Sequence, residues 1–213
     1  MAMLASIFSP GVLITALEMG CIFALVALAL FLSYSTLNIA DLSTDGCFTL
    51  GCAVSCQAAI SLSPALGPWA PVLALAAAML AGVCSGFITA FLQTRLGVES
   101  IMAGIVVNTG LYTINLAVMG FASQMSLLKI PTVYSNFKAL LPAPLAGFSG
   151  LILSALAVAL AGVLLTLFLG TRLGLSIRAT GDNADMVRAS SINPAFTITV
   201  GLCISSALTA LSG

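Results

Sequence analysis

Ionisable side chains are scarce in this chain, which holds six Lys and Arg, six Asp and Glu, and no His. Three acids, Glu18, Asp41 and Asp45, stand in otherwise apolar sequence. The polar segment Gly174–Pro194 adds two arginines and two aspartates, namely Arg178, Asp182, Asp185 and Arg188. Acids in an apolar setting can carry protons or act as a catalytic pair, but the lack of His removes the commonest general base.

The three isolated acids leave two classes of chemistry open. A charge at the centre of a spanning helix costs on the order of 3 kcal/mol on insertion scales, so Glu18, Asp41 and Asp45 should face a cavity or a partner group. A proton-coupled secondary carrier would use such acids and is one alternative. An intramembrane enzyme is another, because Asp41 and Asp45 would share a helix face. The Gly46 break makes that geometry irregular, however, and the chain has no HExxH or GxSxG motif.

The segment Gly174–Pro194 has the features of a short capped helix. Gly181 is interpreted as a turn residue and Asp182 as the N-cap, which places Asp185 at the third helical position. Asp185 and Arg188 are spaced to pair on one face, and Met186, Val187 and Ala189 give the helix an apolar side. Met186 and Val187 are predicted to be apolar anchors for a groove on a partner. A helix of two turns, Asp182 to Ser190, is too short to be stable alone and is expected to dock on something.

The six cysteines are interpreted as small buried hydrophobic residues, because all lie in apolar segments and none forms a CxxC pair. The alternative is a metal or redox site built on Cys47, Cys52 and Cys56. No cofactor is expected.

The elements that must position these residues are membrane-spanning helices. The composition is 61% hydrophobic and 6% charged, with a mean hydropathy of +1.21, far from the usual soluble range. Four runs without Asp, Glu, Lys or Arg are each long enough for a span: 46–94, 100–128, 139–171 and 189–213. Zero net charge and the lack of a basic patch give no indication of a nucleic-acid partner.

The sequence predicts six spans and therefore an all-α integral membrane protein, a polytopic helical bundle. The expected spans are Gly11–Ser33, Cys47–Leu62, Pro71–Leu92, Ile101–Gly120, Gly150–Gly170 and one starting at Pro194. The second helix is expected to be broken, because two Asp, an Asn and two Gly interrupt Tyr34–Gly51. Part of the stretch Asn38–Gly46 should lie at membrane depth, surrounded by protein or a water-filled cavity. Gly82 and Gly86 have the GxxxG spacing of a close helix contact.

Charge counts in short loops predict the orientation. Arg172, Arg178 and Arg188 form the densest basic group and are placed in the cytoplasm. Arg95 then also lies inside, whereas the N-terminus, the Trp69 turn and the connection Phe121–Ser149, with Lys129 and Lys138, lie outside. The N-terminus lacks a basic region and a cleavage pattern, so the first helix is expected to be retained.

Three stretches resemble permease subunits of bacterial ABC importers of the branched-chain amino acid and simple-sugar class. "LNIADLSTDGCFTLG", Leu37 to Gly51, is similar to a family block rich in Asp, Thr and Gly, and "IMAGIVVNTGLYTINLAVMG", Ile101 to Gly120, is similar to a second. The most specific block, "LGLSIRATGDNADMVRASSIN", resembles the segment that carries the cytoplasmic coupling helix. Members linked to tryptophan or other amino acid uptake are the most similar. Two positions depart from the family pattern: Ser191, where a Gly is usual, and Ala117, where an Arg is frequent.

The resemblance implies a permease that forms the path for a small solute, an amino acid rather than a sugar, in the bacterial cytoplasmic (inner) membrane. Its implied partners are a separate ABC ATPase subunit, an extracytoplasmic substrate-binding lipoprotein, a second permease copy and membrane lipid. The permease itself would not be an enzyme. Residues 1–213 would form one transmembrane domain, shortened at the C-terminus relative to the family, whose members continue with further helices.

The resemblance and the residue chemistry together give two sets of candidate residues. The predicted ATPase-coupling set is Arg178, Gly181, Asp182, Asn183, Asp185, Met186, Val187 and Arg188. The predicted translocation pathway consists of Glu18, Asn38, Asp41, Asp45, Asn108 and Asn115. For Asp41 and Asp45 the alternative is a capping role, in which a carboxylate accepts backbone N–H groups where the helix restarts near Gly46.

Overall fold

The structure is a computed structural model that describes residues 10–122, 124–125, 132–140 and 147–213. Within these ranges every regular element is a helix. The elements are α2 (Pro10–Leu30), the π-helix η1 (Phe31–Thr36), α3 (Thr44–Leu66), the 3₁₀-helix η2 (Gly67–Trp69), α4 (Ala70–Arg95), α5 (Ser100–Val118), α6 (Val133–Leu140), α7 (Ser149–Leu169), α8 (Arg172–Asp182), α9 (Ala184–Ala189) and α10 (Pro194–Ser212).

All six expected spans are confirmed as helices that are long and apolar enough to cross a membrane: Gly11–Thr36, Thr44–Pro64, Ala70–Arg95, Ser100–Val118, Ser149–Leu169 and Pro194–Ser212. The bundle is therefore that of a polytopic helical membrane protein. The second span differs from the expectation only in its bounds, because α3 begins three residues before Cys47 and passes through Pro64 in its last turn. Pro64 lacks the N–H that would bond the Ile60 carbonyl, and the helix ends two residues later.

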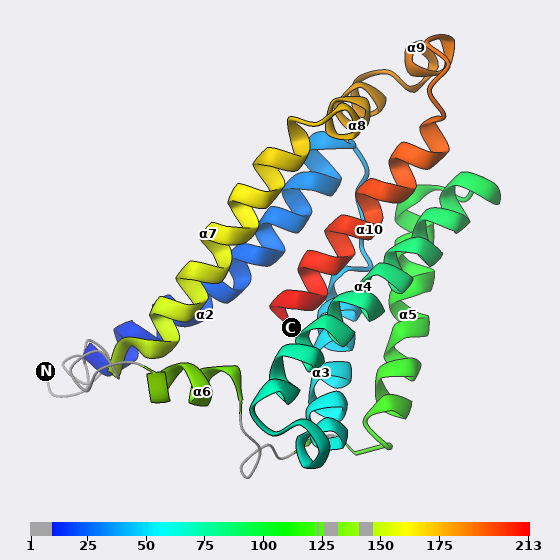
Figure 1. Cartoon of the computed structure of the whole chain (residues 1–213). Helices are drawn as coiled ribbons and strands as arrows, with labels where there is room; N and C mark the ends of the chain where they lie inside the picture. Colours follow the sequence, from blue (N-terminus) through cyan, green and yellow to red (C-terminus); the bar gives the residue numbers. More distant parts are fainter. Residues whose placement is uncertain (1–9, 123, 126–131, 141–146) are drawn as a thin grey trace, which may run out of the picture.

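The predicted break is present, and it lies before α3. The first helix continues through η1, and Leu37–Ser43 is then non-helical. Figure 1 shows this stretch running back along the bundle, so that α3 begins partway along its height. Other helices pack against the break at both ends: Leu37 packs against Gly201 of α10, and the backbone of Leu42 packs against Gly104 of α5. This burial explains how irregular backbone is tolerated at membrane depth.

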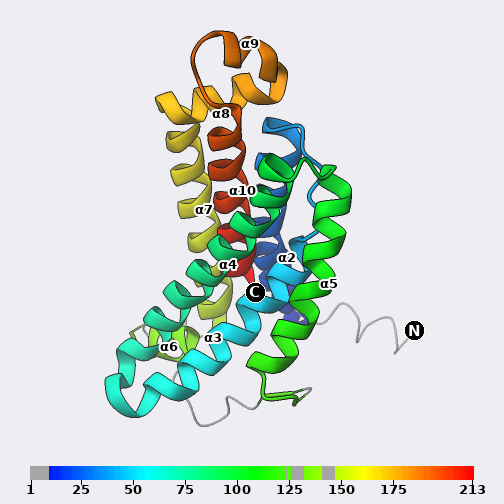
Figure 2. The same ribbon diagram turned by 90° about the vertical axis from the view of Figure 1, so that its right-hand side faces the viewer.

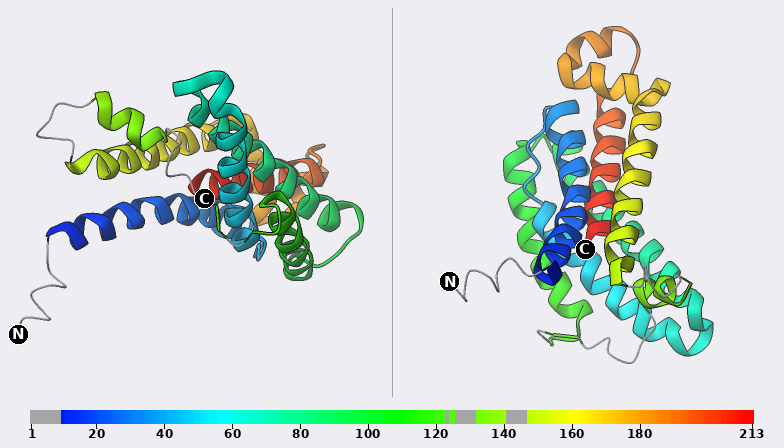
Figure 3. Two further views of the ribbon diagram at one scale, coloured as in Figure 1. Left: turned by 90° about the horizontal axis from the view of Figure 1, so that it is seen from below. Right: turned by 90° about the vertical axis from the view of Figure 1, so that its left-hand side faces the viewer.

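Helix α10 is the most buried span and lies between the pair α2 and α7 and the group α3, α4 and α5 (Figures 1 and 3). The close contact predicted for Gly82 and Gly86 is made with α10. A Cβ on Gly86 would lie 2.7 Å from the Leu202 carbonyl oxygen, and one on Gly82 would lie 2.6 Å from that of Ser206. Small residues at these two positions therefore let the α4 and α10 backbones touch.

The loops are divided between the two ends of the bundle as the charge count predicts. The α4–α5 connection, α8 and α9 lie at one end, and η2, α6 and the start of α2 lie at the other (Figures 1 and 2). Helix α6 lies within the connection Phe121–Ser149 and was not predicted from the sequence. Lys129, used in the orientation argument, lies outside the described residues. Which end faces the cytoplasm stays a prediction.

Candidate functional site

The polar segment folds into two helices, of which the first, α8, is seated on the end of the bundle. Thr171 caps α8, with its Oγ1 accepting from Gly174 N at 3.3 Å. Gly174, Ile177 and Thr180 recur every three residues and are buried, so they form one inward face. Through this face α8 contacts α7, α10 and η1.

A buried hydrogen bond joins α8 to α10. The hydroxyls of Thr180 and Thr197 lie 2.8 Å apart, and Thr180 also donates to the Ser176 carbonyl at 2.7 Å. Ile177 beside them is fully buried. Helix α8 is therefore held against the membrane helices, and it presents α9 beyond them (Figure 2). The expected docking of the short helix Asp182 to Ser190 concerns α9 and stays a prediction.

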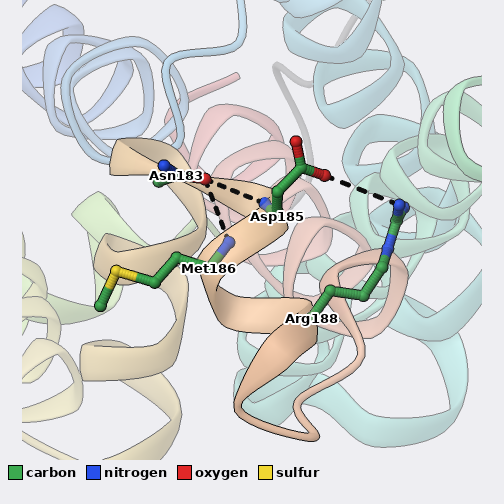
Figure 4. Close-up of polar contacts among 4 residues, drawn as sticks. All are labelled: Asn183, Asp185, Met186 and Arg188. Atoms are coloured by element: carbon green, nitrogen blue, oxygen red, sulfur yellow. Dashed lines mark hydrogen bonds and ion pairs between the residues drawn. The ribbon is translucent and has the colours of Figure 1, made fainter.

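The short helix α9 is capped by Asn183, and the prediction of Asp182 as N-cap is wrong. Asn183 Oδ1 accepts from the backbone N–H groups of Asp185 and Met186, both at 3.1 Å (Figure 4). Asp182 is instead the last residue of α8, and Asn183 has the extended backbone of a cap. The two candidate caps are adjacent and chemically similar, so the sequence pattern alone did not separate them.

The predicted ion pair is confirmed, and it is exposed. Arg188 Nη1 lies 3.8 Å from Asp185 Oδ1, with both side chains largely in solvent (Figure 4). An ion pair of this kind contributes little to stability, about 0–1 kcal/mol. Arg178, on α8, is also exposed. These charges are therefore available to a partner surface.

Only one of the two predicted apolar anchors is accessible. Met186 is 68% exposed, whereas Val187 is 4% exposed and packs α9 against its own chain. The prediction that Val187 offers itself to a groove is therefore wrong, because a six-residue helix needs one buried side chain to hold it in place. Two exposed residues were missed, Leu175 at 56% and Ile192 at 37%. They flank the charged residues, and their apolar character in the most polar segment was the available signal.

Gly181 is not a turn residue, because it lies inside α8. A Cβ at this position would collide with the carbonyl oxygen of Thr36, the last residue of η1. The glycine is required by this close backbone approach, which sequence spacing could not show.

Asp41 bonds the backbone just before α3 and does not cap the helix itself, because Ser43 is the N-cap residue and α3 has no side-chain cap. Asp41 Oδ1 accepts from Ser43 N at 2.8 Å, one residue before α3 begins, and the Asp41 side chain is 5% exposed. Asp45 is exposed in the first turn of α3, where the positive end of the helix dipole favours an acid. The two carboxylates do not share a helix face, because Asp41 precedes the helix.

The two asparagines of α5 hold the start of α3. Asn115 Nδ2 donates to the Gly46 carbonyl at 3.1 Å and to Thr49 Oγ1 at 2.6 Å, and Asn108 Oδ1 packs over the Gly46 backbone. Asn38 is exposed and has a positive φ of 55°, which Asn adopts more readily than most residues. Each of these three residues therefore has a local structural role at or beside the break.

Glu18 lies on α2 against Gly150, in the first turn of α7. The positive end of the α7 helix dipole favours a carboxylate at this position. Tyr134 of α6 is nearby: burial, and then the Glu18 carboxylate, raise the pKa of Tyr134. Glu18 therefore precedes the break by several helical turns and lies close to α6.

Two cavities lie near these residues. One, of about 460 Å³, opens beside the break and is lined by Leu30, Phe31, Tyr34, Ser35, Ala40, Asp41 and Leu42. Asp41 is the one predicted pathway residue on its wall. The other, of about 410 Å³, is lined mainly by apolar residues of α2, α3, α4, α7 and α10 together with Tyr134, and by none of the predicted pathway residues.

The cysteines are free, and their burial was overestimated. Cys47 is buried, with its Sγ 3.2 Å from the Ser206 carbonyl oxygen, but Cys84 is exposed on the outside of α4. In a membrane the outer surface of a bundle is also apolar, so an apolar residue need not lie inside.

The six spans, together with α8 and α9 before the last of them, define a multi-pass helical membrane protein with an exposed helix at one end. The family described as "Branched-chain amino acid transport system / permease component" matches residues 12–213, and the chain belongs to this family. It is 32% identical over 201 residues to a tyrosine transport system permease protein of Clostridioides difficile, and 32% identical over 208 residues to an uncharacterized protein of Rickettsia prowazekii.

These alignments cover 94% and 95% of this chain but 62% and 66% of the two relatives, so the chain spans about two thirds of their length. No solved structure showed significant similarity to it. Membership of a transport permease family favours the permease interpretation over the proton-coupled carrier and the intramembrane enzyme.

Proposed function

We propose that this chain is the membrane-spanning permease subunit of an ATP-driven importer, and that α8 and α9 form the docking site for a separate ATPase subunit. The observation that carries the proposal is the arrangement of α8 and α9 in a chain of this family. Helix α8 is fixed to the bundle by buried residues, and α9 presents exposed side chains beyond it.

The docking surface consists of an apolar centre and charged residues around it. Leu175, Met186 and Ile192 are exposed apolar side chains suited to a groove, and Arg178, Asp185 and Arg188 can pair with charges of the partner. Asp182 and Asn183 connect α8 to α9, Val187 holds α9 in place, and Gly181 lets the end of α8 lie against η1.

The transported solute is a small amino acid-like molecule. The relative named as a tyrosine transport permease supports this class. A substrate-binding lipoprotein delivers the solute at the α6 end, and two permease copies form the path through the membrane. The break is the part of this chain that contributes to the path, with Asp41 on a cavity wall and Asn38, Asp45, Asn108 and Asn115 supporting the local backbone. Glu18 contributes at the α6 end.

A co-purification experiment tests the docking site. Leu175 and Met186 are replaced together by Ser in the protein co-expressed with its proposed ATPase subunit. We expect normal insertion into the membrane and at least a tenfold loss of bound ATPase and of ATP-dependent amino acid uptake, roughly the cost of two truncated interface anchors. Trp69→Ser is the matched control for ATPase binding, because Trp69 is as exposed as Met186 but belongs to η2, which lies at the opposite end from α9.

Wild-type levels of bound ATPase and of uptake in the double variant would refute the docking site. Uptake by the wild-type protein that continues without any ATPase, and collapses with the proton gradient, would instead favour the carrier.

A further inference from the structure

The end of α8 rests directly on the backbone of η1. Gly181 approaches Thr36 so closely that a Cβ would collide with the Thr36 carbonyl oxygen and would lie 3.1 Å from the Leu37 carbonyl carbon. Contact between two backbones has no side-chain rotamer that could absorb a displacement. A movement of α8 along this contact must therefore move the end of η1 or separate from it.

A second close contact, made by α10, holds Leu37, the residue that follows Thr36. Leu37, the first residue of the break, is 4% exposed, and its side chain lies against Gly201 of α10. A Cβ on Gly201 would collide with Leu37 Cδ1 and would lie 3.2 Å from Cγ. Because the Thr180–Thr197 hydrogen bond ties α8 to α10, the end of η1 is enclosed by elements that are bonded to each other.

The segment that follows leads directly to the candidate path. Leu37 is followed by Asn38 with its positive φ, then by the Asp41 turn and the start of α3. The π-helix before it is a type of irregularity that is frequent at functional sites. A short route through the backbone thus leads from α9 to the break by way of Asn183, Gly181, Thr36 and Leu37.

We propose that Gly181 is the positioning residue that passes movement of α8 and α9 to the break, through its backbone contact with Thr36. The Gly201–Leu37 contact keeps the receiving end of η1 in place. This inference rests on the proposed function, because it assigns a route to the movement that the bound ATPase causes. Gly181 needs no contact with the ATPase or with the solute.

The test uses the complete importer, with the permease, its ATPase and its solute-loaded binding protein reconstituted in liposomes. Gly181→Ala places a methyl group against the Thr36 carbonyl. We expect the variant to retain its ATPase, but to lose solute uptake and the stimulation of ATP hydrolysis by the loaded binding protein, each by roughly tenfold or more, within the usual range of coupling between sites. Gly162→Ala in α7 is the control, because nothing lies within 4 Å of the added methyl group.

A second pair of variants separates coupling from folding. Gly201→Ala should weaken stimulation in the same way by pushing Leu37, and Leu37→Val in the same chain should restore much of it, because valine lacks the colliding Cδ1 atom. A purely structural role would instead reduce the amount of assembled complex. The amount of ATPase bound to each variant is therefore measured together with its stimulation.

Stimulation and uptake of Gly181→Ala within twofold of wild type would overturn the inference and leave the docking proposal intact. Loss of the bound ATPase in parallel with activity would also overturn it, since Gly181 would then serve assembly alone. If the wild-type protein binds no ATPase, the proposed function fails, and the inference fails with it.

Discussion

At the scale of single residues, the backbone at the break and at the start of α3 is bonded by polar side chains. The Asp41 carboxylate accepts the Ser43 N–H in a buried position, and Asn115 donates to the Gly46 carbonyl in the first turn of α3. A buried N–H left without a partner costs about 1–3 kcal/mol. Asp41 also lines the cavity beside the break, so one residue combines a structural role with a place on the proposed path.

Two substitutions at Asp41 separate these roles. Asp41→Asn keeps an acceptor oxygen for Ser43 and should leave thermal stability within about 1 kcal/mol of wild type, whereas Asp41→Leu removes the acceptor and should destabilise the protein by about 1–3 kcal/mol. Stability in detergent and solute uptake are measured for both. Reduced uptake by a stable Asp41→Asn protein would assign the charge to the path. Equal stability and uptake in both variants would contradict either role.

At the scale of elements, the sequence alone predicted each helix whose apolar pattern extends over many residues. Six apolar stretches predicted six spans, because a run of about 20 apolar residues has few other stable forms. Short polar elements were harder to place. Helix α8 was not predicted, because it is stabilised by the burial of Ile177 and Thr180 against other helices. The predicted cap of α9 was wrong by one residue. The contacts of Gly181 and Gly201 involve distant residues, which spacing along the chain does not reveal.

The assignment of the α9 cap can be tested directly. Asn183→Ala removes the acceptor of two backbone N–H groups and should destabilise α9 by about 1 kcal/mol, while Asn183→Asp should retain the helix. Hydrogen exchange at the amides of Asp185 and Met186 reports the change. Asp182→Ala is the control and should leave both amides protected, because Asp182 ends α8 and accepts from neither. Faster exchange in the Asp182 variant alone would restore the original assignment.

At the scale of the whole molecule, the two ends of the bundle differ in chemistry. One end carries α8, α9 and the residue Arg95, and the other carries η2, α6 and the exposed Trp69 (Figure 1). Three of the arginines lie between 172 and 188, in a short connection where basic residues favour the cytoplasmic side. An ATPase has access to α8 and α9 only if that end faces the cytoplasm. A test of the orientation is therefore also a test of the docking site.

Labelling with a membrane-impermeant maleimide tests this orientation. Trp69→Cys should react in intact spheroplasts, whereas Met186→Cys should react only after the membrane is opened, because each side chain is well exposed at its own end. The wild-type protein gives the background from its six native cysteines, which lie within the apolar segments where the reagent does not enter. Reaction of Met186→Cys in intact spheroplasts would place α9 outside. That result would contradict both the charge-based orientation and the ATPase docking site, since ATP is hydrolysed on the cytoplasmic side.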